Sequence, residues 1–98
     1  MAFDFRLKVF YTVATRLSFT KAAAELFITQ PAVTKHIKEL EQQLNVQLFL
    51  RNGSSIVLTT AGKILLQYAE KIFQTYTELE TEATVLRLVC DGQPRGTQ

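Results

Sequence analysis

The most restrictive feature of the sequence is a seven-residue repeat of apolar side chains in its last third. One series is aliphatic and consists of Leu65, Ile72, Leu79 and Leu86. A second series, offset by four residues, consists of Ala69, Tyr76, Ala83 and Cys90. This a/d pattern predicts a helix over residues 59–90 that packs against another helix along its length. About thirty helical residues would span about 45 Å, which is longer than a domain of this size can cover.

We therefore expect the chain to form a homodimer through this helix. Leaving such side chains in water would cost roughly 1.5–3 kcal/mol for each residue that could be fully buried. Leu66 and Phe73 lie off the seam and are predicted to hold the helix to the rest of the domain. The predicted dimerisation residues are Leu65, Ala69, Ile72, Tyr76, Leu79, Ala83 and Leu86.

Shorter helical patterns precede this repeat. Apolar residues spaced by four, three and four predict a first helix from about residue 4 to residue 16. Its inward stripe is predicted to be Phe3, Leu7, Phe10 and Ala14. Ser18 is a candidate N-cap for a short second helix over residues 19–26, in which three consecutive alanines favour helix formation.

A third helix is predicted over residues 30–44. Thr29 is a candidate N-cap, and Pro31 fits the first turn, where its missing N–H costs no hydrogen bond. Asn45 can adopt the left-handed conformation that closes a helix. The same spacing of four, three and four predicts an inward stripe of Val33, Ile37, Leu40 and Leu44.

A β-hairpin is predicted between the third and the last helix. Two β-type runs, residues 47–50 and 56–58, flank the polar stretch 51–55, which has Asn52 and Gly53 at its centre. Asn-Gly between apolar runs is a strong hairpin signal.

The expected fold is mainly α, a winged helix-turn-helix (three helices plus a two-stranded wing) followed by a long dimerisation helix. We expect a winged helix-turn-helix domain at 1–58, a linker or dimerisation helix at 59–90 and a flexible tail at 91–98.

With the apolar stripe turned inward, the third helix presents Gln30, Thr34 and Lys38 outward, four residues apart. An amide can pair bidentately with adenine, a lysine reaches guanine or phosphate, and threonine offers a hydroxyl and a methyl group. No carboxylate interrupts the first two turns, since Glu39 and Glu41 come only near the far end. This face predicts insertion into the major groove of double-stranded DNA.

The distribution of charge along the chain bears on the kind of partner it binds. Residues 1–63 carry eight Lys/Arg and four Asp/Glu, whereas residues 64–98 carry three and five. The basic N-terminal part is consistent with a polyanion surface, although ordinary surface charge gives the same totals.

One cysteine and one histidine cannot form a disulfide or a Cys/His zinc site, and no cofactor motif is present. The densest apolar run, residues 64–66, is far too short to span a membrane. The N-terminus lacks a signal-peptide profile, so we expect a cytoplasmic protein.

Two other function classes stay open at this point. The heptad helix is also compatible with a module that binds other proteins. An enzyme is disfavoured, because the chain shows no activated nucleophile, no paired carboxylates and no phosphate-binding loop around Gly53 or Gly62.

Two pairs of segments closely resemble the DNA-binding domain of LysR-type transcriptional regulators. The first pair is residues 18–26 followed by 29–41, and the second is residues 48–51 followed by 58–62. Several motifs occur in one order, so the resemblance is far more specific than a single helix-turn-helix match, and it covers about residues 5–90.

This resemblance implies that the outer face of the third helix enters the major groove, and that Arg51 and the hairpin tip grip the backbone or the minor groove. Lys35 stands where the family often has arginine, and Asn45 where it commonly has glycine. The expected DNA-binding residues are Ser18, Thr20, Thr29, Gln30, Pro31, Ala32, Thr34, Lys35, Lys38, Arg51, Asn52 and Gly53.

The resemblance also implies an antiparallel pairing of the last helix with its partner. Family members usually continue into a domain that binds a small-molecule effector, and the full-length proteins form higher oligomers. The chain stops in the Gly-Gln-Pro-Arg-Gly stretch of residues 92–96, so we expect it to be an isolated DNA-binding fragment.

Overall fold

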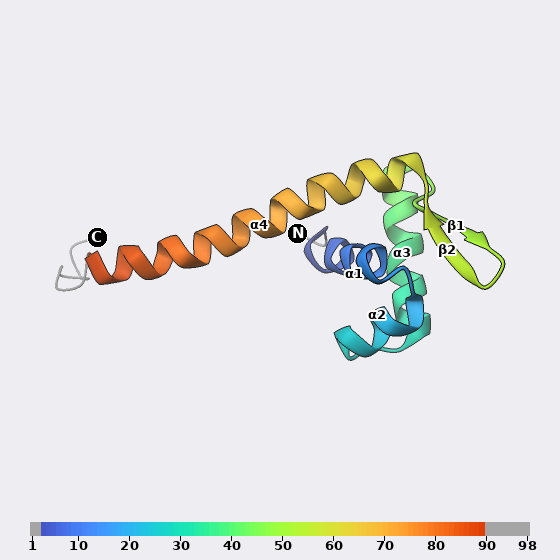
Figure 1. The fold of residues 1–98 in the computed structure, drawn as a ribbon, viewed down its shortest axis with the longest axis horizontal. Coiled ribbons are helices and arrows are strands. Elements are labelled where there is room, and N and C mark those ends of the chain that lie inside the picture. Colours follow the sequence, from blue (N-terminus) through green and yellow to red (C-terminus); the bar gives the residue numbers. More distant parts are fainter. Residues whose placement is uncertain (1–2, 90–98) are drawn as a thin grey trace.

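A computed structural model describes residues 3–89, with side chains from Phe5 onward. Three short helices and a hairpin gather at one end of the molecule, and one long helix projects away from them (Figure 1). This arrangement confirms the predicted winged helix-turn-helix with a long final helix. The expectations for Cys90, for the tail at 91–98 and for the side chain of Phe3 lie outside the described residues. The elements are α1 (Phe3–Arg16), α2 (Phe19–Leu26), α3 (Gln30–Leu44), β1 (Phe49–Asn52), β2 (Ser55–Leu58) and α4 (Thr60–Val89).

Local capping chemistry sets the ends of α2 and α3. The Ser18 Oγ accepts a hydrogen bond from the backbone N–H of Lys21 at 3.1 Å, and the Thr29 Oγ1 accepts one from that of Ala32 at 3.2 Å. Both helices end in a left-handed residue, Phe27 with φ 58° and Asn45 with φ 57°. The caps confine the connection between the two helices to a tight turn.

The core lies where α1, α2 and α3 meet. Phe10, Val13, Val33 and Leu40 are fully buried, and Leu44 is half-buried against them. The predicted inward stripes are confirmed for the described residues of α1 and for α3. The stripe residues below a tenth exposed are Leu7, Phe10, Ala14, Val33, Ile37 and Leu40.

The strands of the hairpin differ in their bounds from the prediction. Strand β1 begins at Phe49 rather than at residue 47, so Arg51 and Asn52 lie on the strand and not in the connecting tip. The physical reason is that residues 47–48 are bonded elsewhere. The Leu48 N–H donates to the Glu41 carboxylate at 2.7 Å, and the Leu48 carbonyl accepts from the Thr59 N–H at 3.0 Å.

The first half of α4 packs against α1. Leu66 and Phe73 are half-buried against the core, as predicted, and the rings of Tyr11 and Phe73 lie 5.2 Å apart. Ala69 was predicted on the seam toward a partner, but the structure buries it completely inside the domain. Leu66, Ala69 and Phe73 are spaced by three and four and share one helix face, and the small methyl of Ala69 lets α1 approach.

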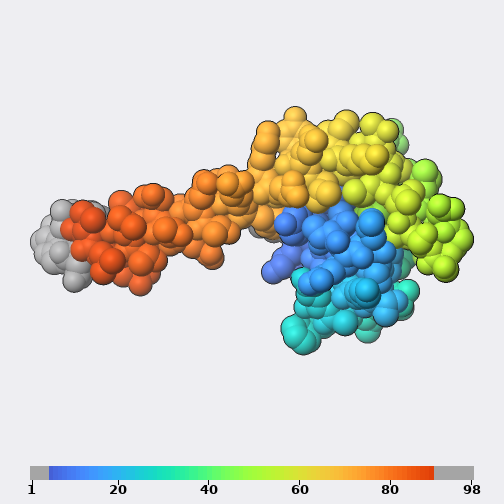
Figure 2. Space-filling model, in the orientation of Figure 1, coloured from blue at the N-terminus to red at the C-terminus, as the bar shows by residue number. Residues whose placement is uncertain are grey.

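The second half of α4 leaves the body of the domain (Figures 1 and 2). The molecule measures 59 × 26 × 20 Å, and the projecting helix accounts for its elongation. Tyr76, Leu79 and Leu86 are more than half exposed on it. No helix among residues 3–89 is apolar enough over a sufficient length to cross a membrane.

The start of α4 is fixed by Thr59 and Gly62 to residues 47–48, which precede the hairpin. The Thr59 Oγ1 accepts from the Gly62 N–H at 2.9 Å and donates to the carbonyl of Gln47, so one hydroxyl joins the start of α4 to the segment that precedes β1. Gly62 is buried, and a Cβ built on it would stand only 2.3 Å from the Leu48 carbonyl oxygen. No side chain fits there unless the backbone of one element shifts.

We therefore expect Gly62→Ala to lower the free energy of unfolding by roughly 1–3 kcal/mol, because overpacking outweighs the gain in helix propensity. Urea unfolding followed by circular dichroism measures this change. The matched control is Gly53→Ala, which has φ +67° and no neighbour within 4 Å of an added Cβ, so it should lose only about 1 kcal/mol through backbone strain. A Gly62→Ala variant as stable as the parent would contradict this close packing of α4 against Leu48.

Candidate nucleic-acid interface

The outer face of α3 is open to solvent over its first three turns. Gln30, Lys35 and Lys38 are exposed and Thr34 is half-buried, while Val33 points into the core from the opposite side. The burial of the apolar stripe fixes the rotation of α3 about its axis. The polar residues predicted to read DNA are therefore the ones that the fold leaves accessible.

The first turn of α2 contacts the first turn of α3 through an exposed hydrogen bond. The Thr20 hydroxyl donates to the Gln30 Oε1 at 3.2 Å. This bond orients the Gln30 amide and leaves its NH₂ group free to donate. Thr20 thus holds Gln30 in place within the protein, besides its predicted contact with DNA.

The residues at the N-termini of α2 and α3 already make hydrogen bonds within the protein. Ser18 and Thr29 accept capping bonds, and each keeps a hydroxyl hydrogen that can be donated to an anion. The N–H of Ala32 is used by the cap, so Ala32 can offer only its half-buried methyl group. Pro31 is exposed and has no N–H to offer.

A hollow of about 190 Å³ lies between α3 and the hairpin. Thr34 and Lys38 line it from α3, and Arg51 lines it from β1. The fold therefore brings together three predicted contact residues from two elements. Asn52 and Gly53 are exposed at the turn end of the hairpin, and Gly53 adopts φ 67°.

Phe19 is a residue of this region that the sequence reasoning did not select. The Arg51 guanidinium carbon lies 5.7 Å from the centroid of the Phe19 ring, within cation–π range. Phe19 also packs against Phe49 of β1, with ring centroids 6.0 Å apart. No local pattern indicates this pairing, because Phe19 and Arg51 are far apart in sequence and meet only in the folded domain.

The carboxylates near the interface are bound to protein groups. Glu39 lies on the side of α3 that faces α1, where its Oε1 is 3.2 Å from the Arg6 Nε. Glu41 lines the hollow, and its Oε2 accepts the Leu48 N–H at 2.7 Å. This hydrogen bond partly satisfies the Glu41 charge beside Lys38 and Arg51.

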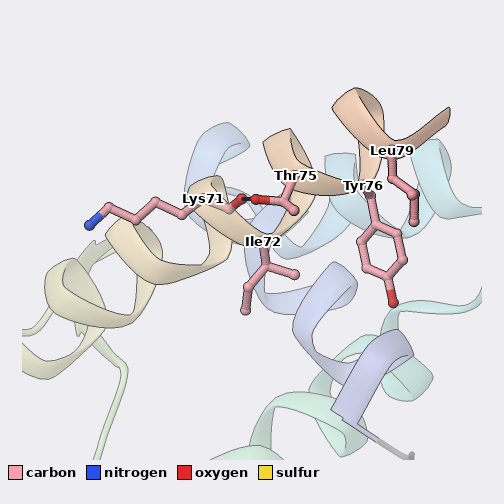
Figure 3. A pocket seen from close by; sticks show the side chains of 5 residues that line it. All are labelled: Lys71, Ile72, Thr75, Tyr76 and Leu79. Atoms are coloured by element: carbon pink, nitrogen blue, oxygen red, sulfur yellow. Dashed lines mark hydrogen bonds between the residues drawn. The ribbon is translucent and has the colours of Figure 1, made fainter. Parts of the chain in front are cut away.

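A separate apolar surface lies on α4 beyond its contact with α1. Ile72, Tyr76 and Leu79 point to one side of the helix, whereas Lys71 extends away from them (Figure 3). A second hollow joins Ile72 and Tyr76 to Phe5 of α1. Among the predicted dimerisation residues, Leu65 is half-buried against the core, Ala69 is unavailable to a partner, and Ile72, Tyr76, Leu79, Ala83 and Leu86 are exposed.

A two-helix turn with an exposed polar second helix, supported by a hairpin, defines a winged helix-turn-helix protein. The sequence model described as "Bacterial regulatory helix-turn-helix protein, lysR family" matches residues 5–63. The chain belongs to this lysR family.

Its relatives are named as transcriptional regulators. The chain is 50% identical over 66 residues to the HTH-type transcriptional regulator XapR of Escherichia coli (strain K12), covering 67% of this chain and 22% of that protein. It is 39% identical over 90 residues to the RuBisCO operon transcriptional regulator of Allochromatium vinosum, covering 92% of this chain and 30% of that protein. The chain thus spans less than a third of the length of these relatives.

The fold is also similar to solved structures. The crystal structure of the BenM DNA-binding domain in complex with catB site 1 DNA has a TM-score of 0.80 and 30% sequence identity. The match covers 91% of this chain and 96% of that one, so it includes most of the long helix as well as the winged domain.

Proposed function

We propose that this chain is the DNA-binding part of a dimeric bacterial transcriptional regulator that recognises a specific double-stranded sequence. Helix α3 enters the major groove, and the wing at 51–55 lies on the backbone or in the minor groove. The observation that carries this proposal is the exposed outer face of α3, with Gln30, Thr34 and Lys38 turned away from the buried stripe. The similar BenM domain was solved in complex with DNA, which supports DNA as the ligand of this chain.

The contact residues divide by chemistry into two groups. Gln30 and Thr34 are suited to base edges, because an amide and a hydroxyl with a methyl group discriminate between base pairs in the major groove. Lys35, Lys38 and Arg51 are suited to phosphates, which fix the position of the protein on the duplex. The capping hydroxyls at the N-termini of α2 and α3 would add phosphate contacts that the helix dipole favours.

The proposed homodimer forms through the exposed side of α4. Its charges favour an antiparallel pair. The half next to the winged domain carries Lys63, Glu70 and Lys71, a net charge of +1, whereas the projecting half carries Glu78, Glu80, Glu82 and Arg87, a net charge of −2. Antiparallel pairing would set the acidic half of one helix opposite the basic half of the other. Two α3 helices related by a twofold axis would then meet half-sites of a pseudo-palindrome.

The proposed segments are a winged domain at 1–58 and a dimerisation helix at 59–90. The role requires no catalytic activity, and access to a bacterial chromosome would place the protein in the cytoplasm. A small-molecule effector and a higher oligomer are expected only of a longer parent protein, of the length that the curated relatives have.

We expect Gln30→Ala to cost about 1–3 kcal/mol of binding free energy at one base-pair position and to relax specificity there. The measurement is selection of bound duplexes from a random pool, followed by titration of the selected site and its single-base variants. Gln43→Ala is the matched control, because Gln43 lies on the α1 side of the same helix and accepts a hydrogen bond from Arg6 at 3.3 Å. If no sequence is enriched, or if both variants bind like the parent, the groove assignment is wrong.

We expect Leu79→Lys to shift the chain from dimer to monomer, because a charge would replace an apolar contact of roughly 1.5–3 kcal/mol in each protomer. Light scattering or analytical ultracentrifugation at micromolar concentration measures the change. Thr81→Lys adds the same charge about half a turn further along α4, away from Leu79, and should leave the dimer intact. A monomeric parent chain would defeat this proposal.

A further inference from the structure

Arg51 projects from β1 over the ring of Phe19 instead of pairing with an acid. Among the described residues, the arginines that pair with a carboxylate are Arg6 and Arg16, and Arg51 is not one of them. The guanidinium lies over the aromatic ring instead, with its carbon 5.7 Å from the ring centroid. Such a contact restrains a cation without neutralising its charge.

The Phe19 ring is itself held from behind. It meets Phe49 edge-on, with an interplanar angle of 70°, and Phe49 packs in turn against the fully buried Phe10 at 5.4 Å between centroids. This series of aromatic contacts runs from the core to the surface of the domain. A half-buried ring fixed in this way offers a rigid platform for Arg51.

The platform determines where the guanidinium stands relative to α3. Phe19, Lys38 and Arg51 line the same hollow between α3 and the hairpin. A free arginine side chain would sample many rotamers, and ordering it on binding would weaken affinity. Because the Arg51 side chain rests on Phe19, it already lies on the α3 side of the hairpin before any ligand binds.

We propose that Phe19 is a positioning residue for DNA binding, which holds the Arg51 guanidinium beside Lys38 so that both cations meet the phosphate backbone together. This inference rests on the proposed function and deepens it, because it couples the wing to α2 and α3. The expected contribution is modest, about two- to fivefold in affinity, as for a cation–π contact at an exposed site.

A double-mutant cycle separates positioning from core packing. The variants are Phe19→Leu, Arg51→Ala and the double variant, with Phe19→Tyr as the conservative control that keeps the ring. Their dissociation constants are measured on a random-sequence duplex at low salt, where phosphate contacts dominate binding. We expect Phe19→Leu to weaken binding about two- to fivefold in the parent chain, to have no effect in the Arg51→Ala chain, and Phe19→Tyr to bind like the parent.

A second measurement on the free protein does not depend on DNA. The Phe19 ring should shift the NMR signals of the Arg51 side-chain protons upfield, and Phe19→Leu should remove that shift while Phe19→Tyr keeps it. Equal effects of Phe19→Leu in both backgrounds, or unshifted Arg51 signals in the parent, would overturn the positioning role alone. A parent chain that shows the shift but binds no duplex would instead defeat the proposed function, and with it the role in binding.

Discussion

The burial of one stripe of α3 against α1 is the contact on which the rest of the structure depends. Val33 and Leu40 are fully buried and Ile37 nearly so, and together they fix the rotation of α3 about its axis. A helix has only one side opposite its buried stripe, so the same packing decides that Gln30 and Lys38 face outward. The apolar contacts of the core therefore decide which polar side chains are available for the proposed recognition of DNA.

A second set of contacts links the parts that lie around this core. Thr59 bonds to the backbone of residues 47–48, Glu41 bonds to Leu48, and Gly62 allows α4 to approach the same segment closely. The hairpin, the end of α3 and the start of α4 therefore converge on one short stretch of backbone. The position of the wing relative to α3 is set here, and the Phe19–Arg51 contact extends that link to the N-terminus of α2.

Features encoded locally could be predicted from the sequence. The apolar spacing of α1 and α3, the capping residues Ser18 and Thr29, and the left-handed Asn45 depend on neighbours along the chain, and the structure agrees with each of them. The polar outer face of α3 followed directly from its apolar stripe.

Features that depend on distant contacts were not predicted. Ala69 fits both a heptad seam and the inward face of α4. Only the position of α1 decides that Ala69 is buried within the domain rather than facing a partner. The start of β1 depends on hydrogen bonds that Leu48 makes with Thr59 and Glu41, and the role of Phe19 depends on an arginine in another element. In each case the information lies in the tertiary structure and not in a local pattern.

The most direct test is to map backbone amide shifts by NMR while the chain is titrated with a duplex selected for binding. If the outer face of α3 and the wing meet DNA, the largest shifts will fall on Gln30, Lys35 and Arg51, and Glu39 on the α1 side of α3 will change little. Shifts confined to the projecting half of α4, with the amides of α3 unchanged, would contradict this account.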